Sequence, residues 1–300
     1  MIAIIRSIIE VLWGPEPIIT IQHFFGSGWL RLFQVITYVG DTQGIIVLIA
    51  LALWISGRRL AYSLIGIVLL AVVTNLLLWK IIGLPRPHDP RIVVWDSSLM
   101  SSFPSGHTVI ATTLWGLLSA LGWIPKVVAV VIILAGMLSR LYLGMHYLGD
   151  VFGGGLIGLV LVAIHQRLWP AIAGWFSRQS FKVFQVLGGL TLSGVIVALP
   201  FAGTSLRLWQ VLGMVAGATI GSLLEYWYVR FSPTKVSLGK QALKVLLGLT
   251  GLIALLLIPN LFGSNEWVLN GVAFALAALW LMLLAPALFV RMGLSQTATR

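Results

Sequence analysis

The sequence predicts an all-α protein, a polytopic membrane bundle of about nine transmembrane helices. Of its 300 residues, 59% are hydrophobic and only 9% are charged, which is too little polar surface for a water-soluble domain of this length. Apolar stretches of roughly 20 residues, the length that crosses a hydrocarbon core, recur along the whole chain. Because a backbone in lipid must satisfy its own hydrogen bonds, each stretch is expected to be a helix.

The N-terminal segment, residues 1–41, is predicted either to lie along the membrane interface or to cross the membrane once. Two isoleucine-rich pieces, 1–13 and 16–24, are separated by a Gly-Pro pair, and a third piece, 28–39, follows a Gly-Ser-Gly sequence. Glycine and proline interrupt helices, so the three pieces are not expected to form one continuous span.

Nine predicted spans follow the N-terminal segment. They cover residues 42–57, 60–83, 106–123, 125–143, 149–168, 182–200, 207–229, 241–259 and 267–290. A drop in hydrophobicity at 169–181 separates a first region, 42–170, from an additional C-terminal region of four helices, 182–291. The main polar feature of the second region lies between Glu225 and Arg230, where an ion pair or an interface anchor is expected.

The basic residues sort by loop and thereby predict an orientation in the membrane. The net charge is +11, but its location matters more than its sum, and nucleic acid is not an expected partner. If the loop that holds Arg58 and Arg59 is cytoplasmic, alternation of the spans puts twelve of the nineteen basic residues on that side. The other ten are Lys126, Arg167, Arg178, Lys182, Arg230, Lys235, Lys240, Lys244, Arg291 and Arg300. The opposite side carries Lys80, Arg86, Arg91, Arg140 and Arg207.

A histidine and an aspartate four residues apart are candidates for catalysis. They lie in the sequence Ser-Arg-x5-His-x3-Asp, in which Arg140, His146 and Asp150 are the charged or ionisable members. On a helix, residues at this spacing share a face, so the carboxylate can accept the imidazole N–H. Such a partner fixes the tautomer and stabilises the imidazolium that forms when the other ring nitrogen bonds phosphorus. His146 is therefore the candidate nucleophile.

A Pro-Ser-Gly-His sequence, residues 104–107, predicts a helix start that binds an anion. The unpaired N–H groups of a first helical turn favour negative charge, and Ser105 adds a hydroxyl donor beside Gly106. His107 follows, where it can protonate a leaving oxygen and later activate the water that cleaves a phosphohistidine.

Three cations on the same side of the membrane complete the predicted site. Lys80, Arg86 and Arg140 would surround the oxygens of a transferring phosphoryl group and supply the charge that phosphoryl transfer depends on. No metal and no cofactor are expected, because Asp89 and Asp96 are scattered carboxylates and make a poor magnesium site beside three cations. With no cysteine, thiolate metal sites and disulfides are excluded.

These three clusters, in this order, resemble the type 2 phosphatidic acid phosphatase family, a family of membrane-bound lipid phosphatases. Its signatures are a Lys/Arg-Pro motif, Pro-Ser-Gly-His, and Ser-Arg-x5-His-x3-Asp, and the second and third match completely. The resemblance covers roughly residues 40–168. In the first motif five residues separate Lys80 from Arg86, where the family usually has six, and one residue turns a helical side chain by about 100°.

The resemblance implies a helical phosphatase core at 42–170 and metal-independent catalysis at the extracytoplasmic face of the cell inner or plasma membrane. It implies that His146 is the nucleophile, Asp150 its partner and His107 the acid and base. The phosphate contacts that it implies come from Lys80, Arg86, Ser105, Gly106 and Arg140. The expected substrate is a lipid phosphate or diphosphate, such as polyprenyl diphosphate, phosphatidate or phosphatidylglycerol phosphate.

Two other functions remain open at the level of sequence. A phosphotransferase would use the same phosphohistidine and pass the group to a second lipid instead of water. A lipid transporter or flippase is suggested by the number of spans. A transport route, however, needs polar groups near mid-membrane, and the last four spans carry almost no charge until their ends. Surfaces that face lipid and surfaces that face a second subunit have nearly the same composition, so the sequence predicts no oligomeric state.

Overall fold

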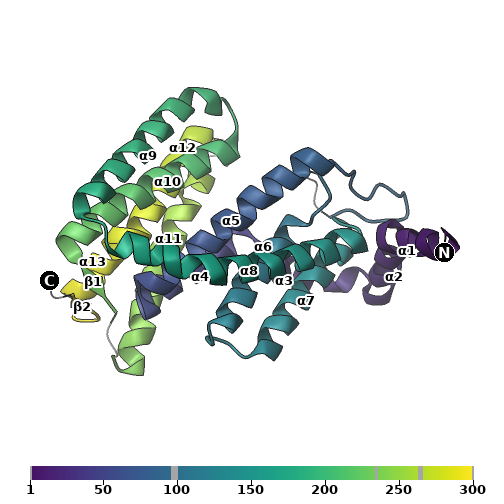
Figure 1. Cartoon of the computed structure of the whole chain (residues 1–300), viewed down its shortest axis with the longest axis horizontal. Helices are drawn as coiled ribbons and strands as arrows, with labels where there is room; N and C mark the ends of the chain where they lie inside the picture. The colour runs from purple at the N-terminus through teal and green to yellow at the C-terminus, as the bar shows by residue number, and fades with distance from the viewer. Residues whose placement is uncertain (1, 96–100, 234–235, 263–265, 299–300) are drawn as a thin grey trace. The chain divides into compact units, whose positions relative to one another are not determined.

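The chain folds almost entirely into helices, as the sequence predicts (Figure 1). The computed structural model describes residues 2–95, 101–233, 236–262 and 266–298. Two short strands, β1 (Phe231–Ser232) and β2 (Gln296–Thr297), pair antiparallel. The predicted class, an all-α polytopic membrane bundle, is confirmed.

The chain divides into two compact units. The first unit comprises Met1–Ile49 and Tyr62–Ile172, and the second comprises Ala50–Ala61 and Ala173–Arg300. All three sequence clusters that carry candidate chemistry belong to the first unit.

The N-terminal segment forms short helices that pack on the first unit. They are α1 (Ile2–Trp13), α2 (Glu16–Phe25), η1 (Ser27–Trp29), α3 (Leu30–Ile36) and the short 3-10 helix η2 (Thr37–Gly40). Helices α2 and α3 pack against α7, and η2 packs against both α6 and α7. Ile18 of α2 is completely buried in a cluster with Ile92, Leu141 and Val151. The segment is therefore part of the core around the candidate site.

Four longer helices form the centre of the first unit. They are α5 (Arg58–Ile82), α6 (Gly106–Ala120), α7 (Lys126–Tyr142) and α8 (Leu148–Ser177), and α4 (Thr42–Leu51) precedes them. Helices α5, α6 and α8 share a core of Ala71, Val109 and Leu161. Helices α6 and α7 pack directly against each other.

Close approach of α8 to α6 depends on glycine. A Cβ on Gly154 would lie 3.0 Å from Ser105 O, and a Cβ on Gly158 would lie 2.6 Å from Thr112 Cβ. Small residues allow membrane helices to pack this closely. The contact holds the first turn of α6 against the first turns of α8, and both turns belong to the candidate site.

The second unit contains the remaining helices. They are η3 (Ala52–Ser56), α9 (Phe181–Ala202), α10 (Leu206–Leu224), η4 (Glu225–Val229), α11 (Leu238–Phe262), α12 (Trp267–Leu279), η5 (Trp280–Leu284) and α13 (Ala285–Arg291). Helix α10 packs against α9 and α12. At Gly213 and Gly217 an added Cβ would lie 2.0 Å from the carbonyl oxygens of Gly271 and Ala275, so α10 and α12 meet almost backbone to backbone.

Glu225 forms an ion pair, as the sequence suggests, but its partner is not Arg230. The Glu225 carboxylate pairs with Arg58 Nη2 and also accepts the N–H of Phe231 at 2.6 Å. Glu225 is buried, and a buried carboxylate needs both kinds of partner to offset its loss of water. Arg58 is far away in sequence, so a local pattern could not identify it.

Six helical segments in the described part of the chain are long and apolar enough to cross a membrane. They are Arg58–Ile82, Leu148–Ser177, Phe181–Ala202, Leu206–Val229, Leu238–Leu261 and Trp267–Arg291. The pair Ser27–Gly40 and Thr42–Ser56, bent by 56°, would make a seventh. Each of the nine predicted spans contains a helix, but α6 and α7 have only 15 and 17 residues, fewer than the roughly 20 that a full span needs.

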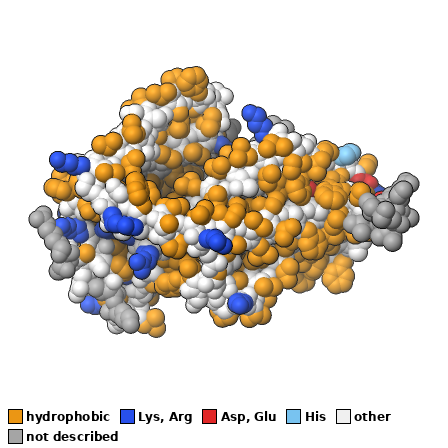
Figure 2. All heavy atoms as spheres, viewed as in Figure 1, with side chains coloured by type: hydrophobic (Ala, Val, Ile, Leu, Met, Phe, Trp, Pro, Cys, Tyr) orange, Lys and Arg blue, Asp and Glu red, His pale blue; other side chains and the backbone are white. Residues whose placement is uncertain are grey.

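The described surface is strongly apolar. Large hydrophobic side chains point outward on several long helices; Leu69 of α5 is 60% exposed and Leu190 of α9 is 65% exposed. Figure 2 shows hydrophobic side chains over much of the face in view, with Lys and Arg in separate small groups. Together with the long apolar helices, this surface makes the chain an integral membrane protein.

Candidate active site

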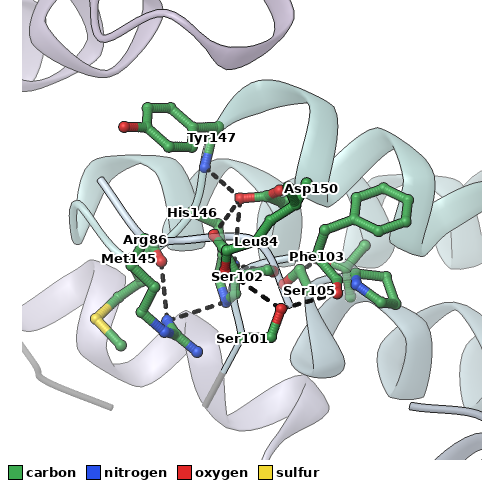
Figure 3. Close-up of polar contacts among 12 residues, drawn as sticks. Leu84, Arg86, Ser101, Ser102, Phe103, Ser105, Met145, His146, Tyr147 and Asp150 are labelled. Carbon is green, nitrogen blue, oxygen red and sulfur yellow. Dashed lines mark hydrogen bonds and ion pairs between the residues drawn. The ribbon is translucent and has the colours of Figure 1, made fainter. Parts of the chain in front are cut away.

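Two connections meet at His146, as Figure 3 shows. His146 lies in the turn between α7 and α8, and Ser102 lies in the connection between α5 and α6. His146 Nδ1 is 2.9 Å from the carbonyl oxygen of Ser102. The N–H of Ser102 donates to Leu84 O at 2.8 Å, and the N–H of Ser105 donates to Asp150 O at 3.1 Å. The structure thus joins the second and third sequence clusters into one polar site.

The turn that carries His146 begins at Gly144. This glycine has φ +67°, and a Cβ there would lie only 2.6 Å from Val93 O, so any side chain would meet both backbone strain and a clash. Helix α8 begins after His146, and only Asp150 of the pair is helical. The expectation that both lie on one helix is therefore wrong. The Asp150 carboxylate instead accepts the N–H of Tyr147 at 2.8 Å, which closes the first turn of α8.

The contacts of His146 define its tautomer. A carbonyl oxygen can only accept, so the Nδ1 that faces Ser102 O carries the proton, and the lone pair of the neutral ring is on Nε2. Arg86 Nη1 lies 3.5 Å from this Nε2 and donates to Met145 O at 2.9 Å. The lone pair therefore faces a cation.

Asp150 stands next to the imidazole but is not its nearest acceptor. Its Oδ2 is 3.7 Å from His146 Nδ1, whereas Ser102 O is 2.9 Å away. The same Oδ2 accepts the hydroxyl proton of Ser102. Both His146 and Asp150 are buried, so the carboxylate charge acts on the ring with little screening by water.

Burial is the main reason why the pKa of His146 is low. The pKa is lowered from 6.5 to about 4: burial lowers it most, Asp150 raises it, and the positive charges of Arg140 and Arg86 also lower it. The ring is consequently neutral at pH 7, and its Nε2 lone pair is available.

The three candidate cations are placed differently. Arg140, in the last turn of α7, is buried and donates from Nη1 to Thr37 Oγ1 at 2.9 Å. Arg86 and Arg140 both lie close enough to lower the pKa of His146. Lys80 is exposed in the last turn of α5 and makes no hydrogen bond or ion pair with another described residue. The structure thus brings the two arginines near the histidine, whereas Lys80 makes no polar contact with described residues of the site.

The start of α6 agrees with its expected geometry. Ser105 is the N-cap and is completely buried; its hydroxyl oxygen accepts from Thr108 Oγ1 at 3.1 Å. Gly106 opens the helix against the ring of Trp79, where a Cβ would lie 2.9 Å from Cζ2. His107 follows and its side chain is 34% exposed. The first turn therefore presents backbone N–H groups together with one accessible imidazole.

Three polar residues that support the site were not identified from the sequence. Gln22 of α2 donates to Val93 O at 2.7 Å and to Tyr142 O at 2.8 Å, and it accepts the N–H of Val93 at 3.0 Å. It thereby ties the α5–α6 connection to the end of α7. Ser102 and Thr37 contact the candidate nucleophile and Arg140, respectively. A lone glutamine in an apolar piece was a usable signal, but a serine and a threonine in ordinary surroundings were not.

The carboxylates of the α5–α6 connection do not form a metal site with other described residues. Asp89 pairs with Arg91 at 2.7 Å, and this hydrogen-bonded partner lowers the pKa of Asp89 to about 2. Asp96 lies outside the described residues. In the part of the chain that the structure describes, no three His, Asp or Glu side chains lie close enough together to hold a metal ion.

The fold and the histidine site define a class: integral membrane proteins with a histidine, an aspartate and arginines gathered at one end of a helical unit. Comparison with known proteins gives the family. Residues 59–173 match the model of the PAP2 superfamily, and residues 209–297 match that of the PAP2 superfamily phosphatase, transmembrane extension. A putative undecaprenyl-diphosphatase of Escherichia coli (strain K12) is 30% identical over 148 residues, which are 44% of this chain and 70% of that protein. The chain belongs to the PAP2 superfamily.

Other relatives are named as lipid phosphatases as well. Sphingosine-1-phosphate phosphatase 2 of Homo sapiens is 28% identical over 232 residues, 73% of this chain and 57% of that protein. The chain thus spans a little over half the length of this relative. A transmembrane PAP2 type phosphatidylglycerolphosphate phosphatase from Bacillus subtilis aligns with 57% of this chain and 92% of its own, at 21% identity and a TM-score of 0.45.

Proposed function

We propose that the chain hydrolyses the phosphate of a lipid phosphate or diphosphate through a phosphohistidine at His146. The observation that carries the proposal is the state of this ring. Its Nδ1 proton is held by Ser102 O, and its Nε2 lone pair lies 3.5 Å from Arg86. A neutral, oriented nucleophile beside a cation is what attack on an anionic phosphoryl group requires.

In the first step Nε2 of His146 bonds phosphorus as the bond from phosphorus to the lipid oxygen breaks. His107 gives a proton to that oxygen, and Asp150 stabilises the imidazolium that forms. In the second step a water oxygen attacks phosphorus, the P–N bond breaks, and His107 takes the proton of the water. Phosphate leaves and the enzyme returns to its starting state.

The phosphoryl oxygens are proposed to be bound by cations and by the start of α6. Arg86 and Arg140 supply fixed positive charge, and their effect on the pKa of His146 supports their place near the reacting group. Ser105 and Gly106 contribute donors of the first helical turn. Lys80 also binds these oxygens through its flexible side chain. With this charge supplied by the protein, catalysis is proposed to need no metal ion.

The substrate class is proposed from the relatives and from the membrane setting. Sphingosine-1-phosphate and undecaprenyl diphosphate, which appear in the names of the relatives, are lipids with a terminal phosphate or diphosphate. Phosphatidate and phosphatidylglycerol phosphate offer the same terminal group. The location proposed is the cell inner or plasma membrane, with the site facing away from the cytoplasm, because Arg58, Arg59 and most other basic residues would then be cytoplasmic.

The proposal also divides the chain into three regions. Residues 42–170 form the phosphatase core and residues 182–291 an additional membrane region, with residues 1–41 as a separate N-terminal segment. Support comes from the two family matches, which fall at 59–173 and 209–297.

The test is release of phosphate by the purified full chain from a panel of lipids, with and without EDTA. The panel contains sphingosine-1-phosphate, undecaprenyl diphosphate, phosphatidate and phosphatidylglycerol phosphate, each labelled in the terminal phosphate. We expect free labelled phosphate from at least one lipid, at the same rate in EDTA. Label that appears on a second lipid would identify a phosphotransferase. A folded protein that releases nothing from any of the four would overturn the proposal, and loss of release in EDTA would overturn its metal-independent part.

The pH dependence of kcat/KM is a separate prediction. The free enzyme needs neutral His146, and burial together with Arg140 and Arg86 lowers the pKa of this group to about 4. The acid limb due to His146 therefore falls as pH drops through about 4 and not through 6.5. Activity is measured from pH 3 to 8 on one lipid of the panel. Arg86→Gln removes a charge that lowers this pKa, so the limb of this variant should shift to higher pH. A limb near 6.5 that Arg86→Gln leaves in place would contradict the assignment.

A further inference from the structure

A carboxylate from the N-terminal segment lies beside His107, the proposed acid. Asp41 Oδ1 is 3.8 Å from His107 Nε2, and the two side chains are 31% and 34% exposed. Asp41 is the residue between η2 and α4, at the bend of 56° between Ser27–Gly40 and Thr42–Ser56. It lies outside both matched family regions, which cover residues 59–173 and 209–297.

The backbone around Asp41 is held firmly against α6. A Cβ on Gly40 would lie 2.3 Å from the carbonyl oxygen of His107, so only glycine lets the two backbones approach this closely. Trp115 Nε1 donates to Val39 O at 3.1 Å, about two turns further along α6. Asp41 Oδ1 also accepts the N–H of Thr42 at 2.7 Å, which fixes the carboxylate at the start of α4.

The same short segment contacts the phosphate-binding side of the site. Thr37, the first residue of η2, accepts from Arg140 Nη1 at 2.9 Å. Helix η2 packs against both α6 and α7, which carry His107 and Arg140. The segment Thr37–Asp41 therefore spans from the proposed phosphate cation to the proposed acid, and both contacts use its polar side chains.

We infer that Asp41 is the positioning residue of His107. Asp41 acts on the proposed acid, His107, as Asp150 is proposed to act on the nucleophile, His146. This inference rests on the proposed function. Asp41 holds Nε2–H of His107 and stabilises the imidazolium, while the other ring nitrogen faces the leaving oxygen. As the P–O bond breaks, the proton passes from His107 to the lipid oxygen. The distance of 3.8 Å is longer than a hydrogen bond, and such contacts commonly tighten when substrate binds.

Asp41→Asn is the sharpest variant, because it removes the charge and keeps an oxygen that accepts the N–H of Thr42. A general acid matters for a poor leaving group and much less for a good one. We therefore expect Asp41→Asn to slow hydrolysis of an alkyl phosphate, phosphatidate, by about 10- to 100-fold, and that of p-nitrophenyl phosphate by less than about 3-fold. His107→Ala should likewise slow hydrolysis of phosphatidate much more than that of p-nitrophenyl phosphate. The double variant, Asp41→Asn with His107→Ala, should be no slower than His107→Ala alone. Glu16 is another exposed carboxylate of the N-terminal segment, so Glu16→Gln is the matched control. This variant should hydrolyse both substrates at wild-type rates.

The outcomes separate the inference from the function on which it rests. If wild type hydrolyses neither these two substrates nor any other lipid of the panel, the proposed function fails; if it hydrolyses another alkyl phosphate of the panel, that lipid replaces phosphatidate in the comparison. If wild type hydrolyses both and Asp41→Asn slows the two equally, or slows neither, the inference is overturned and the function stands. A double variant clearly slower than His107→Ala would also overturn it, because Asp41 would then act independently of His107. The inference is supported if Asp41→Asn unfolds at a temperature close to that of wild type and slows hydrolysis of phosphatidate much more than that of p-nitrophenyl phosphate.

Discussion

Replacing His146 with asparagine is expected to lower the rate of phosphate release by about 10,000-fold or more, the loss typical of a removed nucleophile. Asparagine places an amide N–H near the position of Nδ1, so the donor to Ser102 O is kept and the buried turn stays satisfied. What disappears is Nε2, the atom beside Arg86 that is proposed to bond phosphorus. The measurement is initial-rate release of labelled phosphate by purified protein in detergent or vesicles.

A matched control and a direct probe make this prediction specific. His23, an exposed histidine of α2, should tolerate the same change to asparagine with wild-type rates. Rapid quenching of wild type with labelled substrate should trap an acid-labile, base-stable phosphoenzyme, and His146→Asn should trap none. A folded His146→Asn protein that retains a tenth of wild-type activity would exclude His146 as the nucleophile.

Replacing Asp150 with asparagine is expected to lower kcat by about 100- to 10,000-fold, the range seen when the carboxylate partner of a catalytic histidine is lost. Asparagine keeps an oxygen that can accept the N–H of Tyr147. His146 keeps its acceptor, Ser102 O, so the ring should stay in its tautomer. The change therefore removes mainly the negative charge that lies 3.7 Å from Nδ1 and is proposed to stabilise the imidazolium.

The control for the Asp150 variant is Asp89→Asn. Asp89 lies in the α5–α6 connection and pairs with Arg91, so its loss should change the rate by less than about 2-fold. Steady-state rates and unfolding temperatures of both variants are compared with wild type. An Asp150→Asn protein that folds and keeps wild-type kcat would show that Ser102 O alone orients the nucleophile and that the carboxylate charge plays no part in catalysis.

Much of the fold follows from hydropathy alone. Each of the nine predicted spans contains a helix, because a backbone in lipid has few alternatives to helical hydrogen bonding. Their lengths were less predictable. The apolar stretch around α6 runs to residue 123, but the helix ends at Ala120 in a turn where Gly122 has φ +77°. Hydropathy reports the environment of a segment and does not report where tertiary contacts end its helix.

The sequence by itself determined the class of fold and the family resemblance, and its short motifs made His107, Arg140, His146 and Asp150 candidate site residues. Only the tertiary structure decided which groups those residues meet. Ser102 O, not the Asp150 carboxylate, is the nearest acceptor of His146 Nδ1, and Arg58 is the partner of Glu225. Contacts such as these join residues tens of positions apart, so packing brings them together and no local pattern records them. Asp41 beside His107 is the same case, a carboxylate whose neighbour becomes visible only when η2 packs on α6.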